Sequence, residues 1–594
     1  MVAVLVPVLL YAFLRVGYLL LGGYSRADGR WSVPTAVSIL HERDTDLDEY
    51  TALMPSDPRA DYTLEKVGDD LYTIYPLGAS LVALPHIAAY DLFYFALTGD
   101  SLEQYLLDYG AARVERLVAT SLAALSVVLL YLIARRHLPL LKALGLALAY
   151  GLSTSIWSTA AAALWQQTPT LLLLTLTLGL LDAARERPER IAYAGLTLAL
   201  SFLARPTNAI VIALVTVYVA VTYPRQLWRY LAWAAPVAIA FFAYSHHVYG
   251  HWLPTYYRGS ALGESLDVWE GLAGTLVSPN RGLFVWSPIV LFAFYGAYRS
   301  LRAHTFDRLS GMLWACIALH WLLTGSWQMW WGGHTLGPRF FVDVLPFYAY
   351  LTIPALQSQP LAAEPRPART RHWRQLAGPV AVGVLFVACT AWGAWVQLRV
   401  AKNVGPAQWN ASPVNVDMAP SRLWDWQDVQ FLRQANREPE LRAGLRVGWW
   451  PRFEFNDRIP GQGWSFCERN PFGESFTWMA GRRATFYLEV RRPTDVAISF
   501  RVLDWLTPAA LDSLAVSIGD TPVALTRTFD EHGAAVYSGV LPAEAFAEPL
   551  RYYVLSFTID QAHSPRLKDP ESTDPRQLGL ALDWLALSPF ERGK

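Results

Sequence analysis

Asp28 is the residue of this sequence whose position most favours acid–base chemistry. It lies about half a dozen residues beyond the first membrane-length apolar run, within residues 25–31, Ser-Arg-Ala-Asp-Gly-Arg-Trp. Nothing close to it in sequence explains the carboxylate as a helix cap or as half of a core pair. An acid held at a membrane surface in this way is a candidate general base.

More acids follow Asp28 in the same loop. Residues 41–50 include Asp44, Asp46, Asp48 and Glu49, and the preceding residues 34–40 have the start signal and spacing of a short amphipathic helix. We expect that helix to lie flat on the membrane and to hold Asp28 near the headgroups. The alternative for the later acids is a solvated or cation-binding loop.

Three arginines recur where apolar runs are interrupted, and each is a candidate ligand for a phosphate. Arg205 precedes Pro206, Arg281 lies in Ser-Pro-Asn-Arg-Gly, and Arg339 lies in Gly-Pro-Arg-Phe. A guanidinium fork matches phosphate oxygens bidentately. The alternative is that each arginine anchors a helix end among lipid headgroups.

The segment of residues 327–335 has the composition of a sugar-binding loop. It contains Trp331 and His334 on either side of two glycines that permit close backbone approach. The alternative for its tryptophans is an interfacial aromatic belt. His246, His247 and His251 have no matching acids nearby, so we expect no metal site there.

The whole chain must hold these residues at a lipid bilayer. Its 594 residues are 53% hydrophobic and include 25 tryptophans, and the 49 basic and 49 acidic residues cancel. Mean hydropathy is +0.22. This composition excludes an ordinary soluble enzyme and leaves room for a membrane region plus a separate domain. Cys316, Cys389 and Cys467 are too far apart to indicate a disulfide framework or a zinc motif.

About eleven apolar runs before residue 398 have the length of a membrane span. Lys and Arg concentrate in five connections, which we expect to be cytoplasmic, at residues 135–142, 185–190, 225–229, 299–308 and 366–374. Residues 76–97 contain two prolines, His86 and Asp91, so we predict an interfacial helix there rather than a span. Asp28 and the three arginines then share the outer face.

After residue 398 the periodicity changes. Residues 399–444 mix proline, asparagine and tryptophan with charges and are predicted to be a connector. From 445 to 594 apolar residues alternate, as at Phe486, Leu488 and Val490, with turn signals between the runs. We predict an extracytoplasmic, jelly-roll-like β-sandwich.

Over residues 1–398 the chain resembles the GT-C superfamily of integral-membrane glycosyltransferases, which includes protein O-mannosyltransferases and aminoarabinose transferases. The resemblance rests on Asp28 after the first span, Tyr75-Pro76-Leu77 at the start of a surface helix, the Arg205-Pro206 break, residues 278–283, and residues 332–340. It implies a polytopic GT-C-like helical fold and a polyprenyl-phosphate-linked sugar as donor. Many members have two adjacent acids where this chain has only Asp28, so Asp46, Asp48 and Glu49 stay open as alternatives.

By that resemblance, Asp28 is the catalytic base and Arg205, Arg281 and Arg339 bind the donor phosphate. Tyr75, Asp48, Glu49, Trp331 and His334 are expected to contact substrate. The implied reaction is a single inverting displacement on an extracytoplasmic glycan, lipid or protein acceptor, in a bacterial-type plasma membrane. It requires no nucleotide and no obligatory metal, and a divalent ion stays open as an addition.

Two other classes of function remain open from the sequence. A glycolipid transporter or flippase would also have many spans, but its polar residues would line a path near mid-bilayer rather than one face. A non-catalytic envelope-assembly protein would bind glycans through the β-sandwich alone. No basic patch supports nucleic-acid binding.

Overall fold

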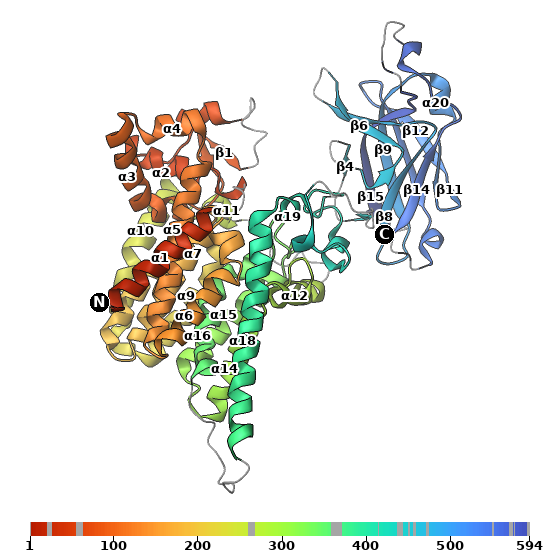
Figure 1. Ribbon diagram of the computed structural model, residues 1–594. Coiled ribbons are helices and arrows are strands. Elements are labelled where there is room, and N and C mark those ends of the chain that lie inside the picture. Colours follow the sequence, from red (N-terminus) through yellow and green to blue (C-terminus); the bar gives the residue numbers. More distant parts are fainter. Residues whose placement is uncertain are drawn as a thin grey trace. The chain divides into compact units, whose positions relative to one another are not determined.

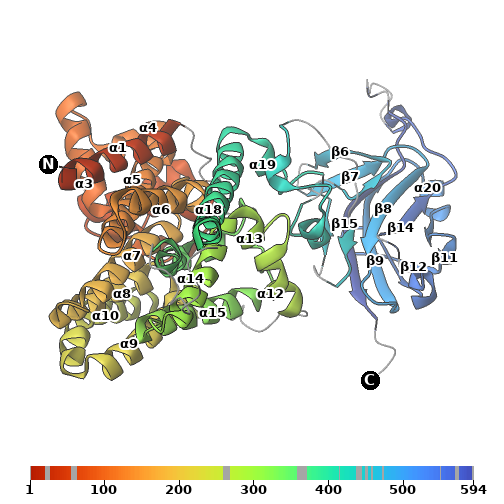
Figure 2. The same ribbon diagram turned by 60° about the horizontal axis from the view of Figure 1, so that its bottom comes forward.

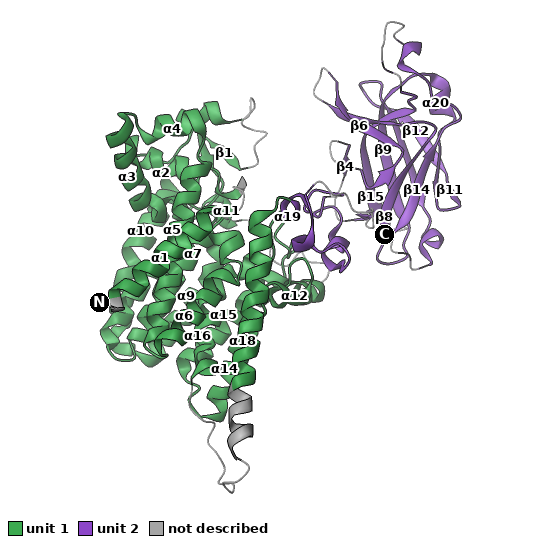
Figure 3. Cartoon of the chain, in the orientation of Figure 1, with its two compact units in different colours: residues 1–404 green, residues 405–594 purple. Residues whose placement is uncertain are grey.

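The chain forms two units in a computed structural model, residues 1–404 and 405–594, as Figure 3 shows. The structure describes residues 2–20, 27–54, 63–258, 268–357, 371–413, 415–435, 444–448, 452–455, 459–470, 474–548, 550, 552–568, 574 and 576–590. Residues 366–370 of the fifth predicted cytoplasmic connection, and residues 25–26 before Asp28, lie outside these ranges. The predicted boundary at residue 398 falls inside the last helix of the first unit.

The first unit is a bundle of apolar helices joined by short turns (Figure 1). Among the described residues, five helical segments are long and apolar enough to cross a membrane: Gly78–Thr98, Ala112–Arg135, Pro224–Tyr249, Arg339–Leu356 and Val380–Lys402. These segments make the chain a membrane protein. The predicted count of about eleven spans is not confirmed and stays a prediction. The main helices of the bundle are α1 (Val2–Leu20), α5 (Ala112–Arg135), α6 (Leu140–Leu152), α7 (Gln167–Ala183), α8 (Ala194–Ala204), α9 (Ala209–Thr222), α10 (Leu227–Tyr249), α14 (Leu291–Arg302), α15 (Arg308–Gly325), α16 (Leu345–Leu351), α17 (Ile353–Leu356) and α18 (Arg371–Lys402).

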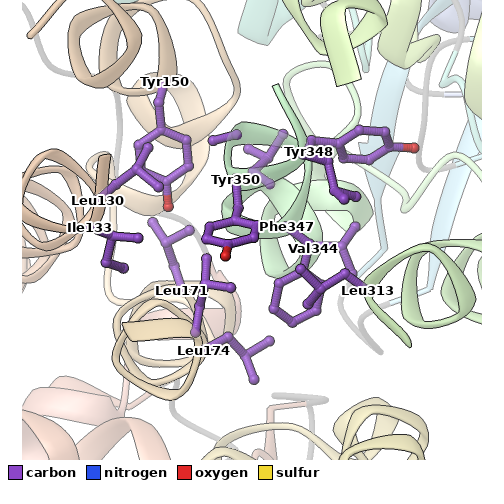
Figure 4. Packing of buried hydrophobic residues seen from close by; sticks show 14 of the residues in the cluster. Leu130, Ile133, Tyr150, Leu171, Leu174, Leu313, Val344, Phe347, Tyr348 and Tyr350 are labelled. Carbon is purple, nitrogen blue, oxygen red and sulfur yellow. The ribbon is translucent and has the colours of Figure 1, made fainter. Parts of the chain in front are cut away.

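The bundle core consists of aliphatic and aromatic side chains from helices far apart in sequence. Figure 4 shows Leu130 of α5, Leu171 of α7 and Phe347 of α16 within one buried cluster. Leucine and phenylalanine side chains in this cluster exclude water and need no hydrogen-bond partner. The outward faces are apolar too, for example Val384 of α18 and Ile239 of α10, as expected for helices that face lipid.

Smaller elements cover one end of the bundle, seen at the top of Figure 1. They are α2 (Ser32–His41), α4 (Leu102–Tyr109) and the hairpin of β1 (Leu64–Val67) and β2 (Asp70–Thr73). The predicted helix at residues 34–40 is present as α2, and its position flat on the membrane stays a prediction. Residues 32–38 are all buried, because α3, α4 and α5 pack around them.

Helix α3 (Gly78–Thr98) coincides with the segment predicted to be interfacial. It starts at the end of α8, where Gly78 packs so closely that a β-carbon would overlap the Ala204 backbone. Further along it reaches α1, where Arg15 donates to Tyr90 Oη at 2.6 Å. Length and composition alone would let α3 cross a membrane. Its course past α8, α7 and α5 to α1 fits a helix lying across the bundle end, and the interfacial placement stays a prediction.

The second unit begins with irregular chain and short helices, α19 (Gly405–Gln408) among them, and continues as strands. Arg422 organises the irregular part: it lies over the Trp409 ring at 4.2 Å and donates to the Trp409 carbonyl at 2.8 Å and to Asp428 at 2.9 Å. These contacts satisfy a guanidinium that is almost fully buried.

Two sheets form the rest of the second unit (Figure 2). One has the order β11-β10-β14-β8-β3, with β5 beside β8, and the other β12-β13-β9-β15-β7-β6, with β4 beside β15. All pairs are antiparallel except β3 with β8. The predicted alternation is confirmed at β8, β9 and β14. The strands are β3 (Leu445–Arg446), β4 (Phe453–Glu454), β5 (Gly461–Gln462), β6 (Trp464–Arg469), β7 (Ser475–Met479), β8 (Arg483–Glu489), β9 (Val496–Trp505), β10 (Ala515–Ile518), β11 (Thr521–Val523), β12 (Leu525–Phe529), β13 (Ala535–Leu541), β14 (Tyr553–Thr558) and β15 (Leu580–Pro589).

The inner faces of these sheets share one core. Phe500 of β9 in one sheet contacts Phe557 of β14 in the other, with ring centroids 5.2 Å apart at 87°. Period-two side chains therefore meet between the sheets, as in a sandwich.

Candidate active site

Asp28 lies in a short 3₁₀ helix, η1 (Ala27–Gly29), and both of its carboxylate oxygens are hydrogen-bonded. Oδ2 accepts from Arg339 Nη1 at 2.8 Å, and Oδ1 accepts from the Tyr75 hydroxyl at 3.1 Å. The Asp28 side chain is 27% exposed. The carboxylate is thus oriented by two donors and still open to a ligand.

Close backbone packing fixes the position of Asp28. A β-carbon on Gly29 would overlap the Glu115 carboxylate of α5 and lie 3.2 Å from the Leu164 carbonyl oxygen. Glu115 is itself buried and accepts from the Leu164 amide at 2.9 Å. The absence of a side chain at residue 29 is therefore what lets the Asp28 turn rest against α5.

Gly29→Ala is expected to disturb the site, because overpacking at a buried contact costs about 1–3 kcal/mol. We expect a lower melting temperature of the detergent-purified protein and a matching loss of activity. Gly17→Ala is the control, since a β-carbon on Gly17 in α1 meets nothing within 4 Å. Equal melting temperatures for the two variants would contradict this account of Gly29.

The segment between α6 and α7 contacts Arg339 and Tyr256. It includes a π-helical turn, Ile156–Ala160, and is buried throughout. The Arg339 guanidinium lies 4.9 Å from the centre of the Trp165 ring, and Gln166 accepts a hydrogen bond from the Tyr256 hydroxyl at 3.3 Å. Neither Trp165 nor Gln166 was predicted from the sequence. The polar residues of Trp165-Gln166-Gln167 interrupt an apolar stretch, and this interruption could have indicated a site.

Arg339 reaches Asp28 from the start of the 3₁₀ helix η9 (Arg339–Val344). The preceding turn needs Gly337, which has φ of +69° and packs against the Trp286 ring. The Arg339 side chain is 17% exposed, and Nη1 is its one nitrogen that donates a hydrogen bond within the described part of the chain. Nε is buried beside Gly332, so an anion would meet the terminal nitrogens of the guanidinium group.

Arg205 and Arg281 lie near Arg339 but have partners other than Asp28. The guanidinium groups of Arg205 and Arg339 lie 5.6 and 5.4 Å from the centre of the same Phe340 ring. Arg205 is ion-paired with Asp343 inside the bundle, and both side chains are buried. Arg281 Nε donates to the Trp331 carbonyl at 3.0 Å, and Nη2 donates to the Gly333 carbonyl at 3.2 Å. An arginine between two apolar runs, such as Arg205, needs an anionic partner to offset its charge. The protein supplies one in Asp343, whereas Arg281 holds the loop of residues 331–333 in place.

The structure places the other residues that were predicted to contact substrate in different environments. Trp331 is 2% exposed and packs edge-on against Trp330, whereas His334 is exposed. Asp48 accepts from the Leu71 amide at 2.9 Å and so ties its loop to the β1–β2 hairpin. Tyr75 is the member of this group that the structure brings to Asp28.

Glu49 is half-buried in the same loop, and burial raises the pKa of its carboxyl from 4.5 to about 7. Between these values the folded protein keeps a proton that the unfolded chain releases, so stability falls as pH rises. Glu49→Gln removes this effect. We expect its melting temperature to exceed that of the wild type by about 2 °C at pH 8 and to match it near pH 4.5. Glu42→Gln, at an exposed position of the loop, is the control. An identical Glu49→Gln difference at both pH values would contradict the raised pKa.

A mainly apolar cavity of about 170 Å³ adjoins Tyr75. Six tyrosines contribute to its wall, and several hydroxyls bond back to protein: Tyr257 donates to the Leu203 carbonyl at 3.0 Å, and Tyr244 bonds Thr45 at 2.8 Å. The rings also pack against one another, as Tyr75 does against Tyr256 with centroids 5.9 Å apart, and together they form a mainly apolar wall. These tyrosines are Tyr72, Tyr75, Tyr244, Tyr249, Tyr256 and Tyr257. The sequence reasoning missed all but Tyr75, although tyrosines recur between residues 244 and 257.

Within the described ranges, no group of three or more His, Cys, Asp or Glu side chains is arranged to hold a metal ion. The Asp28 site therefore comprises one carboxylate, one guanidinium, one phenol and an apolar aromatic cavity. Such a set can orient a base, bind an anion and bury an apolar group.

No known protein-family profile matches the sequence, and no curated protein matches it. Among solved structures, the crystal structure of the Archaeoglobus fulgidus oligosaccharyltransferase in the apo form is similar at 12% identity with a TM-score of 0.38. The match covers 75% of this chain and 62% of the oligosaccharyltransferase. The chain thus spans less than two thirds of that protein's length, at a low structural similarity.

Proposed function

We propose that this protein is a membrane glycosyltransferase that transfers a sugar from a polyprenyl-phosphate donor to an extracytoplasmic acceptor. The observation that carries the proposal is the Asp28 carboxylate, held by Arg339 and Tyr75 beside an apolar cavity. The proposal also draws on the resemblance of residues 1–398 to GT-C enzymes. It places the active face on the outer side of a bacterial-type plasma membrane.

The reaction is a single displacement at the anomeric carbon. The acceptor oxygen attacks this carbon while its proton passes to the Asp28 carboxylate. The bond from the anomeric carbon to the phosphate oxygen breaks, and its electron pair leaves with the lipid phosphate. Attack from the side opposite the leaving group inverts the configuration of the sugar.

Arg339 has two roles in this proposal. Nη1 orients Asp28, and Nη2 binds the phosphate as its charge grows, whereas Nε is buried. The Trp165 ring beside the guanidinium excludes water from one side and strengthens this attraction. Arg205 and Arg281 support the site indirectly, because both side chains are buried, at 3% and 2% exposed, and engaged by Asp343 and by backbone carbonyls.

The tyrosine-lined cavity is suited to the isoprenoid segment next to the donor phosphate. Its wall is mainly ring faces and aliphatic groups such as Leu77 and Leu81, and burying such a chain there removes apolar surface from water. The cavity adjoins Tyr75, so a chain bound in it would end close to Asp28 and Arg339.

The direct test uses the full chain reconstituted in liposomes with a panel of polyprenyl-phosphate sugars and a membrane extract as acceptor. We expect one donor to release polyprenyl phosphate and to label an acceptor. A flippase would move the donor across the bilayer without breaking its sugar–phosphate bond. A purely glycan-binding protein would do neither, so the absence of donor cleavage across the panel would contradict the proposal.

A further inference from the structure

A second cavity, of about 260 Å³, lies at the end of the bundle opposite Asp28. Helix α7 connects the two ends: it begins at Gln167, next to the Asp28 site, and its 17 residues extend for about 25 Å. Arg185, just beyond its last residue, lines the second cavity together with the C-terminal turns of α14. In Figure 1, α14 lies at the far end of the bundle from α2, α3 and α4.

Two arginines in fixed positions line this cavity. Arg185 is ion-paired with Asp307, which also caps α15 by accepting from the Ser310 amide at 2.9 Å. Arg299 of α14 donates from Nη1 to the Gln357 carbonyl at 2.7 Å and to the Ala355 carbonyl at 3.3 Å. Both guanidinium groups are thus placed before any ligand arrives, which lowers the entropic cost of binding.

The electrostatics of the cavity favour an anion. Two arginines and one aspartate line it, together with the hydroxyls of Ser300, Thr305 and Ser310. The buried Asp182 behind it adds little negative charge. That carboxylate is paired with Arg136 at 2.8 Å and accepts from the Tyr350 hydroxyl at 2.8 Å. Unlike the cavity beside Tyr75, this one is mainly polar.

We infer that this cavity binds a phosphate group, and that the group belongs to an anionic lipid or to a soluble phosphate compound. Arginines with neighbouring hydroxyls match phosphate oxygens in charge and in hydrogen-bonding capacity. Basic pockets between helices at a membrane surface are suited to anionic headgroups, especially on the cytoplasmic side, where the charge pattern of the connections predicts this end to lie. The site is separate from Asp28, so phosphate binding there can be tested independently of the proposed transferase activity.

The experiment titrates the detergent-purified full chain with dioctanoyl phosphatidylglycerol, with inorganic phosphate and with dioctanoyl phosphatidylcholine, by calorimetry. The decisive variant is Thr305→Glu. Thr305 is exposed at the cavity, so the new carboxylate repels a phosphate without removing a buried contact. Thr305→Gln is the matched control, with equal size and no charge. A second variant, Arg185→Gln, removes one guanidinium.

We expect saturable binding of phosphatidylglycerol, with a dissociation constant raised about tenfold or more by Thr305→Glu and by Arg185→Gln. Thr305→Gln should raise it much less, because it removes one hydroxyl but adds no charge. Binding of phosphatidylglycerol without inorganic phosphate identifies a lipid headgroup as the source, whereas binding of both identifies a soluble phosphate. Phosphatidylcholine, which carries no net charge, should bind more weakly. Equal affinity of the wild type and Thr305→Glu, or the absence of saturable binding of either anion, overturns the inference.

Discussion

Asp28→Asn is expected to lower sugar transfer by about 10³-fold or more, because an amide cannot take the acceptor proton. Asparagine keeps the size of the side chain and can still accept a hydrogen bond from Tyr75. The loss should therefore appear in kcat rather than in the amount of folded protein. The measurement is initial rate in proteoliposomes at saturating donor and acceptor.

Folding is checked by the melting temperature of the purified variant. The Asp28–Arg339 pair is partly exposed, so its loss should cost little stability. Asp48→Asn is the matched control, since Asp48 is an acid of the same outer region whose carboxylate bonds the Leu71 amide. Full activity of Asp28→Asn together with loss of activity in Asp48→Asn would transfer the base assignment to the later acids.

Arg339→Ala is expected to raise the Michaelis constant for the donor by about ten- to a hundredfold, the effect of losing charge-assisted hydrogen bonds to a phosphate. The Michaelis constant for the acceptor should change much less. Arg339→Lys should recover part of the donor affinity, because it restores the charge but not the planar fork. Steady-state kinetics with donor and acceptor varied in turn separate the two constants.

The control for Arg339 is Arg258→Ala, an exposed arginine of α11 (Thr255–Arg258) that bonds Thr255 at 3.1 Å. It removes one positive charge from the region of the tyrosine-lined cavity without touching Asp28. An equal rise of the donor constant in both variants would indicate a general electrostatic effect. An unchanged donor constant in Arg339→Ala would rule out a phosphate role for Arg339.

Local sequence patterns were sufficient to predict several elements of the fold. Period-two alternation predicted strands at β8, β9 and β14, since a half-buried strand needs one apolar face. The Arg205-Pro206 break predicted an interruption between two apolar runs, and α8 ends there at Ala204, because proline has no amide proton to continue the helix. The same rules predicted the helix α2, but they did not show that residues 32–38 are buried by neighbouring helices.

The site required the tertiary structure. Asp28 and Arg339 are 311 positions apart, and no local rule distinguishes Arg339 from Arg205 or Arg281. All three occupy similar breaks between apolar runs. Their partners depend on which helices pack together: Arg205 meets Asp343, and Arg281 meets the carbonyls of the loop at residues 331–333.

The sequence by itself determined that this is a helical membrane protein with a strand-rich C-terminal domain and an acid just beyond its first apolar helix. Hydropathy and periodicity are properties of neighbouring residues, so they can be read along the chain. The tertiary structure decided which arginine and which tyrosine hold Asp28, and it formed the cavities at the two ends of the bundle. Those contacts join distant segments, and they arise only when the helices pack.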